Sequence, residues 1–303
     1  MNLTLSAKRA LATALAPLII FAAVFSVSAK AEDAPQPALW KLTDHDSEVW
    51  LFGTVHLLDP KLKWQTAKVT KAFNASNTVY FEADTGPEAT AGMQALIGKF
   101  GLNPQGTVLS SLLSEKGNTD LAAAIAQLGL PQQAIANFEP LRPWFASLNL
   151  AIVQLQKQGL KLEAGVEKTL EGQANAAGKK IAYFETAASQ IEAFGSLSAE
   201  AELTYLENGL DKFSEADTTL NQMVTFWVTG NSKALGDLMN EGFSPDEVYE
   251  ALLTKRNRNW AAQIKEIMDG SGKVFIAVGA GHLAGKNSVQ DLLAEYQLKA
   301  VRQ

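Results

Sequence analysis

Two of the three histidines in this chain follow the same short pattern, Gly-x-x-His, directly after an apolar run. Gly53 precedes His56, and Gly279 precedes His282. Short apolar runs of this kind are typical of buried strands, and glycine lets the backbone bend and approach a neighbour closely. An imidazole at such a place can bind a metal ion or transfer protons. The repeated pattern therefore predicts that both histidines belong to one site.

Two carboxylates end strand-like runs in the same way. Glu82 lies near the end of residues 78–84, and Glu185 follows residues 180–184. In open α/β sheets, ligands bind beyond the carboxyl ends of the strands, where the loops converge. Two imidazoles with one or two carboxylates suit zinc, manganese, cobalt or iron, with positions left open for water. We therefore expect a divalent metal and metal-activated water at this site.

Each of these residues also has a purely structural interpretation. A lone histidine near a strand end is often only hydrogen-bonded, and a carboxylate there can cap a helix or face solvent. His45 lies among polar turn residues and is expected to be solvated, and Asp84 is expected to be a turn or cap residue. Gly279, Gly281 and Gly285 loosely resemble a dinucleotide-binding loop, but the 18 residues after Gly285 are too few for the βαβ unit that such a site needs.

A basic cluster lies on the last long predicted helix, at residues 255–258. Arg256 is three residues after Leu253 and four before Trp260, so it lies beside the apolar stripe of the helix rather than opposite it. An arginine at that position can point into a cleft. The alternative is a solvated basic face, which Lys255 and Arg258 fit well.

The elements that position these residues form a sheet at the two ends of the chain. Near the N-terminus, the patterns predict a β-hairpin followed by a helix and a strand, at residues 38–42, 48–54, 64–74 and 78–84. Near the C-terminus, they predict a strand, a helix and a last strand, at residues 273–278, 286–296 and 298–301.

Between these ends, residues from about 87 to 267 are mostly helical in pattern, with breaks at proline and glycine and one short strand at 180–184. The prediction is an α/β fold with a central mixed sheet at the chain ends and a large helical insertion. Because the sequence has no internal repeat and no low-complexity linker, residues 32–303 are predicted to form a single domain.

The N-terminal segment predicts export. Lys8 and Arg9 precede an uncharged stretch from residue 10 to 29, and Ala29-Lys30-Ala31 has the pattern of a signal-peptidase site. Residues 1–31 are therefore predicted to be a cleaved signal peptide, and the mature protein to be periplasmic or secreted. The alternative is an uncleaved anchor, because about 20 apolar residues can just span a bilayer. No other segment is apolar enough to cross one, so no membrane span is expected after cleavage.

The composition narrows the possible partners. The full chain carries a net charge of −6, and loss of residues 1–31 would remove three basic residues and no acidic one. The more acidic mature protein is not expected to bind nucleic acid or an anionic membrane. The chain has no cysteine, which excludes disulfides, thiolate zinc sites and cysteine nucleophiles. The oligomeric state is left open.

Seven motifs of the chain resemble those of the TraB/PrgY/GumN family and occur in the same order. They are Gly53-Thr54-Val55-His56, Phe81-Glu82-Ala83-Asp84, Leu141-Arg142-Pro143-Trp144, Gly165-Val166-Glu167, Phe184-Glu185-Thr186, Arg256-Asn257 with Trp260, and Val278-Gly279-Ala280-Gly281-His282-Leu283. The fourth motif departs from the family, which often has Asp in place of Glu167, and the fifth has Phe184 where Leu is usual.

The resemblance implies an α/β fold like that of the erythromycin-esterase and ChaN group. The family includes the Tiki proteins, which are metal-dependent proteases of secreted signalling proteins, and PrgY, which reduces peptide-pheromone activity. Their active-site residues correspond here to His56, His282, Glu82, Arg256 and Asn257.

The resulting expectation is an exported metal-dependent hydrolase, most simply a peptidase acting on a peptide or protein. His56, His282 and Glu82 would hold the metal, or Glu82 would act as the base; Arg256 would stabilise the oxyanion, and Asn257 would orient substrate or water. Gly53, Gly279 and Glu185 would support these residues. The alternatives are a protein that sequesters a peptide or other ligand without turnover, and a haem or iron binder like the ChaN relatives, for which no cysteine, tyrosine-rich pocket or extra histidine is available.

Overall fold

The computed structural model describes residues 35–86 and 88–303, so the predicted signal peptide at 1–31 lies outside the described residues. Six strands form one sheet in the order β4-β3-β5-β2-β1-β6. Their bounds are β1 Leu39–Thr43, β2 Ser47–Thr54, β3 Thr78–Ala83, β4 Lys180–Glu185, β5 Gly272–Gly279 and β6 Val301–Arg302.

The middle of the sheet is parallel and one edge is antiparallel. Strands β4, β3, β5 and β2 run parallel, β1 pairs antiparallel with β2 as a hairpin, and β6 pairs antiparallel with β1. Phe275, Ile276, Ala277 and Val278 of β5 are all buried, because a central parallel strand is covered on both faces. The predicted α/β fold with a mixed sheet is confirmed.

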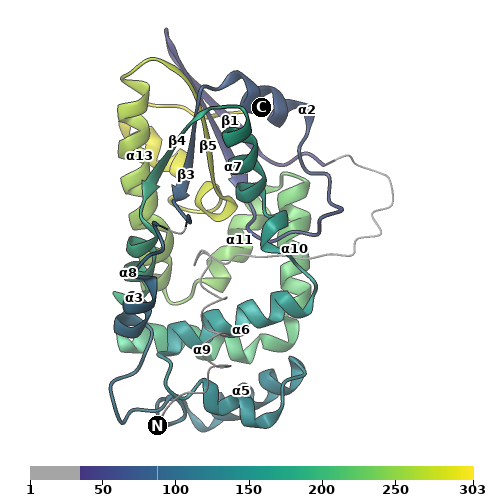
Figure 1. Ribbon diagram of the computed structural model, residues 1–303, viewed down its shortest axis with the longest axis vertical. Coiled ribbons are helices and arrows are strands. Elements are labelled where there is room, and N and C mark those ends of the chain that lie inside the picture. The colour runs from purple at the N-terminus through teal and green to yellow at the C-terminus, as the bar shows by residue number, and fades with distance from the viewer. Residues whose placement is uncertain (1–34, 87) are drawn as a thin grey trace.

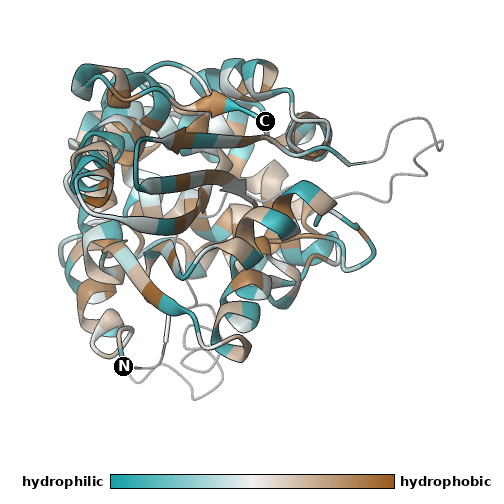
Figure 2. Cartoon of the chain, turned by 90° about the horizontal axis from the view of Figure 1, so that it is seen from above, coloured by the Kyte–Doolittle hydropathy of each residue, from teal (hydrophilic) through white to brown (hydrophobic). Residues whose placement is uncertain are grey.

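Helices cover both faces of this sheet, and Figure 2 shows largely apolar strands in the middle of the molecule with helices around them. On one face, Val49 and Leu51 of β2 pack with Trp260 of α13 (Lys255–Met268). On the other face, Phe52 of β2 packs with Phe275 of β5, which lies edge-on against Phe73 of α2 (Ala67–Ala75). The alternation along β2 thus assigns successive side chains to opposite layers.

The remaining helices lie mostly beyond the carboxyl ends of the parallel strands, and Figure 1 shows α6, α9 and α5 below the sheet. Within the described residues the α-helices of this part are α3 Met93–Phe100, α4 Leu109–Leu112, α5 Glu115–Gln127, α6 Pro143–Lys157, α8 Ala187–Gly195, α9 Ala199–Asp211, α10 Ala216–Val228, α11 Ser232–Gly242 and α12 Asp246–Tyr249. The helix α7 Val166–Ala176 instead lies beside the sheet (Figure 1). Among the described residues, no helix combines the length and apolarity that a membrane crossing requires.

The C-terminal elements are shorter than predicted. The helix expected over 286–296 is α14 (Val289–Leu293), which begins after the capping side chain of Ser288 and ends in one 3-10 turn. Gln297 adopts a left-handed conformation with φ 61°, which stops the helix. The Leu298 N–H still bonds to the Leu293 carbonyl, so the strand expected over 298–301 starts only at Val301.

Candidate active site

The four parallel strands bring the predicted side chains to one edge of the sheet. His56 follows β2, Glu82 lies near the end of β3, Glu185 ends β4, and His282 lies in the 3-10 turn Ala280–Leu283 after β5. The register aligns the ends of β2 and β5, where Thr54 is opposite Gly279. Residues separated by up to 226 positions in sequence therefore meet, because their strands end at the same level.

His56 is held by a carboxylate from the first turn of α7. Its Nδ1 lies 2.9 Å from Glu167 Oε1, and the Thr54 hydroxyl donates a hydrogen bond to the same oxygen. Because a carboxylate accepts, Nδ1 carries the proton. Burial lowers the pKa of His56, but the charge and hydrogen bond of Glu167 outweigh it and the pKa is raised. The other ring nitrogen, Nε2, is buried and has no hydrogen-bond partner among the described residues.

His282 is held by two side chains of α13. Arg256 Nη1 lies 3.0 Å from His282 Nε2, and Asn257 Oδ1 lies 2.5 Å from His282 Nδ1. A guanidinium only donates, so Nε2 accepts and the proton lies on Nδ1, facing Asn257. Burial, Arg256 and His56 together hold the pKa of His282 well below its usual value, which keeps this ring neutral.

Arg256 links the two strand-end glutamates to His282. Its Nε and Nη2 donate to Glu185, Nη2 also donates to Glu82 at 2.9 Å, and Nη1 donates to the Leu252 carbonyl as well as to His282. All five N–H groups of the guanidinium thus have an acceptor. Burial raises the pKa of Glu82 although Arg256 opposes the shift.

A turn of π-helix at Glu250–Thr254 precedes α13. Leu252, Leu253 and Thr254 are buried, and both Arg256 and Asn257 are also buried one turn later. Residues four apart lie on the same side of a helix, so Arg256 and Asn257 face the same interior as Leu252 and Leu253. The neighbours Lys255 and Arg258 are exposed, as expected for a solvated face.

Two glycines allow the strand ends to approach. The N–H of Gly279 donates to Glu82 Oε1 at 2.6 Å, and a Cβ at this position would lie 2.9 Å from that oxygen and 3.9 Å from His56 Nε2. A Cβ on Gly53 would lie 3.0 Å from the Ala280 Cα. Gly279 therefore leaves open the space where Glu82 and His56 converge, and Gly53 allows β2 to approach the turn that carries His282.

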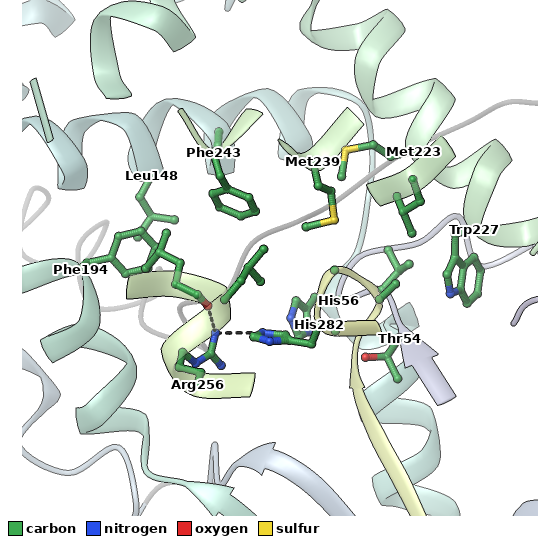
Figure 3. Close-up of a pocket in the computed structure, with 18 of the residues that line it drawn as sticks. Thr54, His56, Leu148, Phe194, Met223, Trp227, Met239, Phe243, Arg256 and His282 are labelled. Atoms are coloured by element: carbon green, nitrogen blue, oxygen red, sulfur yellow. Dashed lines mark hydrogen bonds between the residues drawn. The ribbon is translucent and has the colours of Figure 1, made fainter. Parts of the chain in front are cut away.

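A cavity of about 90 Å³ lies directly over the histidines. His56, His282 and Arg256 form its floor, while Figure 3 shows Met239 and Phe243 above them. The rest of the wall is mostly apolar and includes Leu148, Phe194, Met223, Trp227 and Leu253. Glu82, Glu185 and Asn257 do not line this cavity; they lie behind the histidines and Arg256.

The donor chemistry of the site fits a divalent cation. Glu82 and Glu185 pair with the Arg256 guanidinium, and a third carboxylate, Glu167, pairs with His56. The three carboxylates and one guanidinium leave negative charge in excess when both histidines are neutral. His56 Nε2 is an unpartnered buried donor atom, and imidazole with carboxylate suits zinc, manganese or cobalt. His282 Nε2 lies 3.8 Å from Glu82 Oε1, but it can join the ligands only if its bond to Arg256 opens.

A second set of possible metal ligands lies in the β1–β2 turn and consists of Asp44, His45 and Asp46. In the described part of the chain, one potential ligand atom of each residue lies within 4.8 Å of those of the other two. All three residues are exposed. The Asp44 carboxylate accepts the N–H groups of Asp46 and Ser47 and so stabilises the turn. We assign this cluster no ligand, as the sequence predicted for His45.

The model of the TraB/PrgY/gumN family matches residues 38–302, from just before β1 to the last residue of β6. The chain belongs to this family. The resemblance drawn from the seven motifs is thus confirmed, and every side chain of the candidate site lies within the TraB/PrgY/gumN match.

Two curated relatives are similar over most of their length. Both are described as "Uncharacterized protein YbaP", from Escherichia coli (strain K12) and from Shigella flexneri, and each is 24% identical over 243 residues, which cover 80% of this chain and 86% of the relative. No solved structure matches the chain.

Gly279→Ala tests the close approach of β5 to Glu82 in this TraB/PrgY/gumN member. The added methyl would meet a carboxylate oxygen that Arg256 and the Gly279 N–H hold in place, so something must shift. We expect a loss of about 1–3 kcal/mol in the free energy of unfolding, as for overpacked cores, measured by urea denaturation.

The matched control is Gly172→Ala in the middle of α7, where a Cβ would meet nothing within 4 Å. Because alanine is the better helix former, this change is expected to be neutral or to stabilise by up to about 1 kcal/mol. Equal urea midpoints for the two variants would show that the contact at Gly279 is unimportant.

Proposed function

We propose that this chain is an exported metal-dependent hydrolase that cleaves peptide bonds in the cavity over His56 and His282. The observation that carries the proposal is the buried, unpartnered Nε2 of His56, which lies beside Glu82 and His282 in a site with an excess of carboxylates. A buried polar atom without a partner costs free energy, and a bound cation would remove that cost. Export rests on the pattern of residues 1–31.

His56 and Glu82 are the primary candidates to hold the ion, with His282 as a further ligand. The ion would supply a Lewis acid and an activated water at neutral pH. Glu167 keeps the proton of His56 on Nδ1 and leaves Nε2 available. Asn257 likewise keeps the proton of His282 on Nδ1, but the Nε2 of His282 accepts from Arg256 and becomes available only when that bond opens. Hydrogen bonds of this kind orient the ligand imidazoles of many metal sites.

The roles proposed for Arg256 and Asn257 depend on what they contact. Asn257 bonds His282 and the Asn287 carbonyl and does not line the cavity, so we propose a positioning role instead of direct substrate contact. Arg256 does line the cavity, but its donors are all in use. It would stabilise an oxyanion only after its bond to His282 opens, and the freed N–H would then serve a substrate oxygen.

Sequestration of a peptide without turnover is the second candidate, and the same complete pairing of Arg256 favours it, because no donor is free for a transition state in this conformation. The haem alternative is not proposed further. A cavity of about 90 Å³ over the histidines is far below the roughly 300–1,000 Å³ of ordinary ligand sites.

The decisive experiment uses the mature protein, stripped with a chelator and reloaded separately with Mn²⁺, Co²⁺ or Zn²⁺. We expect one ion per chain by elemental analysis, and cleavage of a mixed peptide library that stops when the chelator is added. Metal uptake without cleavage would support sequestration instead. Cleavage that survives complete removal of metal would contradict the proposed chemistry.

A further inference from the structure

We infer that the site takes a peptide that runs from a second cavity between α6, α9 and α10 to the histidines. The main chain that flanks the scissile bond would lie in this second cavity, and one short aliphatic side chain next to the scissile bond would lie in the cavity over the histidines. This inference rests on the proposed function, because it describes the class of peptide that the same site would bind. It adds a binding subsite that the catalytic residues do not define.

The second cavity is large and adjoins the first. Its volume is about 590 Å³, which lies in the usual range for ligand sites. Four residues line both cavities: Ser147 and Ala151 of α6, Tyr205 of α9 and Met223 of α10. A ligand that reaches His56 from the second cavity must therefore pass these side chains.

The size and lining of the smaller cavity select the side chain. About 90 Å³ is less than the roughly 150 Å³ of an apolar protein cavity that binds benzene. The wall over the histidines is mostly apolar, and in the part of the chain that the structure describes Arg256 and the two histidines are the only titratable side chains that line it apart from Tyr205. An aliphatic group of the size of valine or leucine fits this space, whereas an indole or a charged side chain does not.

The larger cavity offers acceptors that a peptide main chain would satisfy. Gln154 is buried, its Nε2 donates to Asp217, and its Oε1 has no partner within residues 35–86 and 88–303. The Oδ1 of Asn240, on α11, is also buried without a partner in these described ranges, and both residues line the cavity. Buried acceptors are usually paired, and peptide N–H groups are donors that an acyl chain lacks. These acceptors favour a peptide over a lipid.

The test measures binding and cleavage separately, with metal-loaded protein and octapeptides of glycine and serine that carry one central Leu or Trp. We expect the Leu peptide to bind about tenfold more tightly than the Trp peptide by calorimetry, because pockets of this kind discriminate size by such factors. Equal affinity for both peptides, or no binding of either, would overturn the inference.

Ala151→Leu narrows the shared wall, and Gln154→Met removes the unpartnered acceptor while keeping the side-chain length. Each is expected to weaken binding of the Leu octapeptide about tenfold or more. Gln154→Met should change binding of N-acetyl-leucine amide little, because Gln154 lines only the second cavity and this short ligand has no flanking residues to lie there. Gln156→Leu, an exposed change on the same helix, is the control, and thermal unfolding verifies that each variant is folded.

The outcomes separate this inference from the proposed function. Selective binding of the Leu peptide without cleavage would sink the hydrolase proposal and leave the subsite intact. Metal-dependent cleavage that is indifferent to the central residue and to Ala151→Leu would keep the hydrolase and overturn the subsite.

Discussion

Loss of divalent metal and of at least about 10³-fold in hydrolytic rate is expected for His56→Ala. The substitution removes the buried nitrogen that has no protein partner, and with it the atom best placed to hold the ion beside Glu82. Metal ions contribute several kcal/mol to transition-state stabilisation, and each 1.36 kcal/mol corresponds to tenfold in rate. Elemental analysis and cleavage of the peptide library, both on the reloaded variant, measure the effect.

A graded series makes this prediction specific. Glu167→Gln keeps an acceptor for the His56 Nδ1 proton but removes the charge that raises the pKa of His56, so metal affinity should fall about 10- to 100-fold. His45→Ala, in the exposed hairpin turn, should change neither metal content nor cleavage. If His56→Ala retains a full equivalent of metal, the proposed ligand is wrong.

Arg256→Ala is expected to have the largest effect on stability, a loss of about 3–5 kcal/mol in the free energy of unfolding. The change leaves Glu82 and Glu185 buried together without their shared cation, and removing one partner of a buried ion pair typically costs this much. It also leaves His282 Nε2 without its donor. Urea denaturation followed by tryptophan fluorescence provides the measurement.

Two further variants show whether the cost arises from uncompensated charge. Arg258→Ala, on the exposed face of the same helix, should change stability by no more than about 0.5 kcal/mol. The triple variant Arg256→Met, Glu82→Gln and Glu185→Gln removes all three charges and should recover part of the loss. A loss below about 1 kcal/mol for Arg256→Ala would contradict the proposed importance of the cluster.

Sequence alone predicted the four parallel strands and the gathering of their polar residues at the carboxyl ends of these strands. Each of four predicted strands corresponds to an observed strand within one or two residues: 48–54, 78–84, 180–184 and 273–278. Short apolar runs that end in polar residues are typical of buried strands, so the sequence pattern was sufficient here. The position of β5 between β3 and β2 was not predicted, since pairing over such sequence distances leaves no local pattern.

The environment of the two histidines could be predicted only in part. Helical periodicity placed Arg256 beside the apolar stripe but could not show that it is buried, because its burial depends on Glu82, Glu185 and His282, which come from three distant parts of the chain. Glu167 was noted only through the Gly165-Val166-Glu167 motif. Its contact with His56 depends on where α7 begins relative to β2.

The central position of β5 also sets when the molecule can become complete during synthesis. Roughly 190 residues separate β3 from β5, and ribosomes add about 5–20 residues per second. About 10–40 seconds therefore pass between the synthesis of β3 and that of β5, the strand that pairs with both β2 and β3. Until then their pairing edges are open to other chains. A nascent chain stalled before residue 272 is thus expected to be prone to aggregation, whatever the stability of the finished fold.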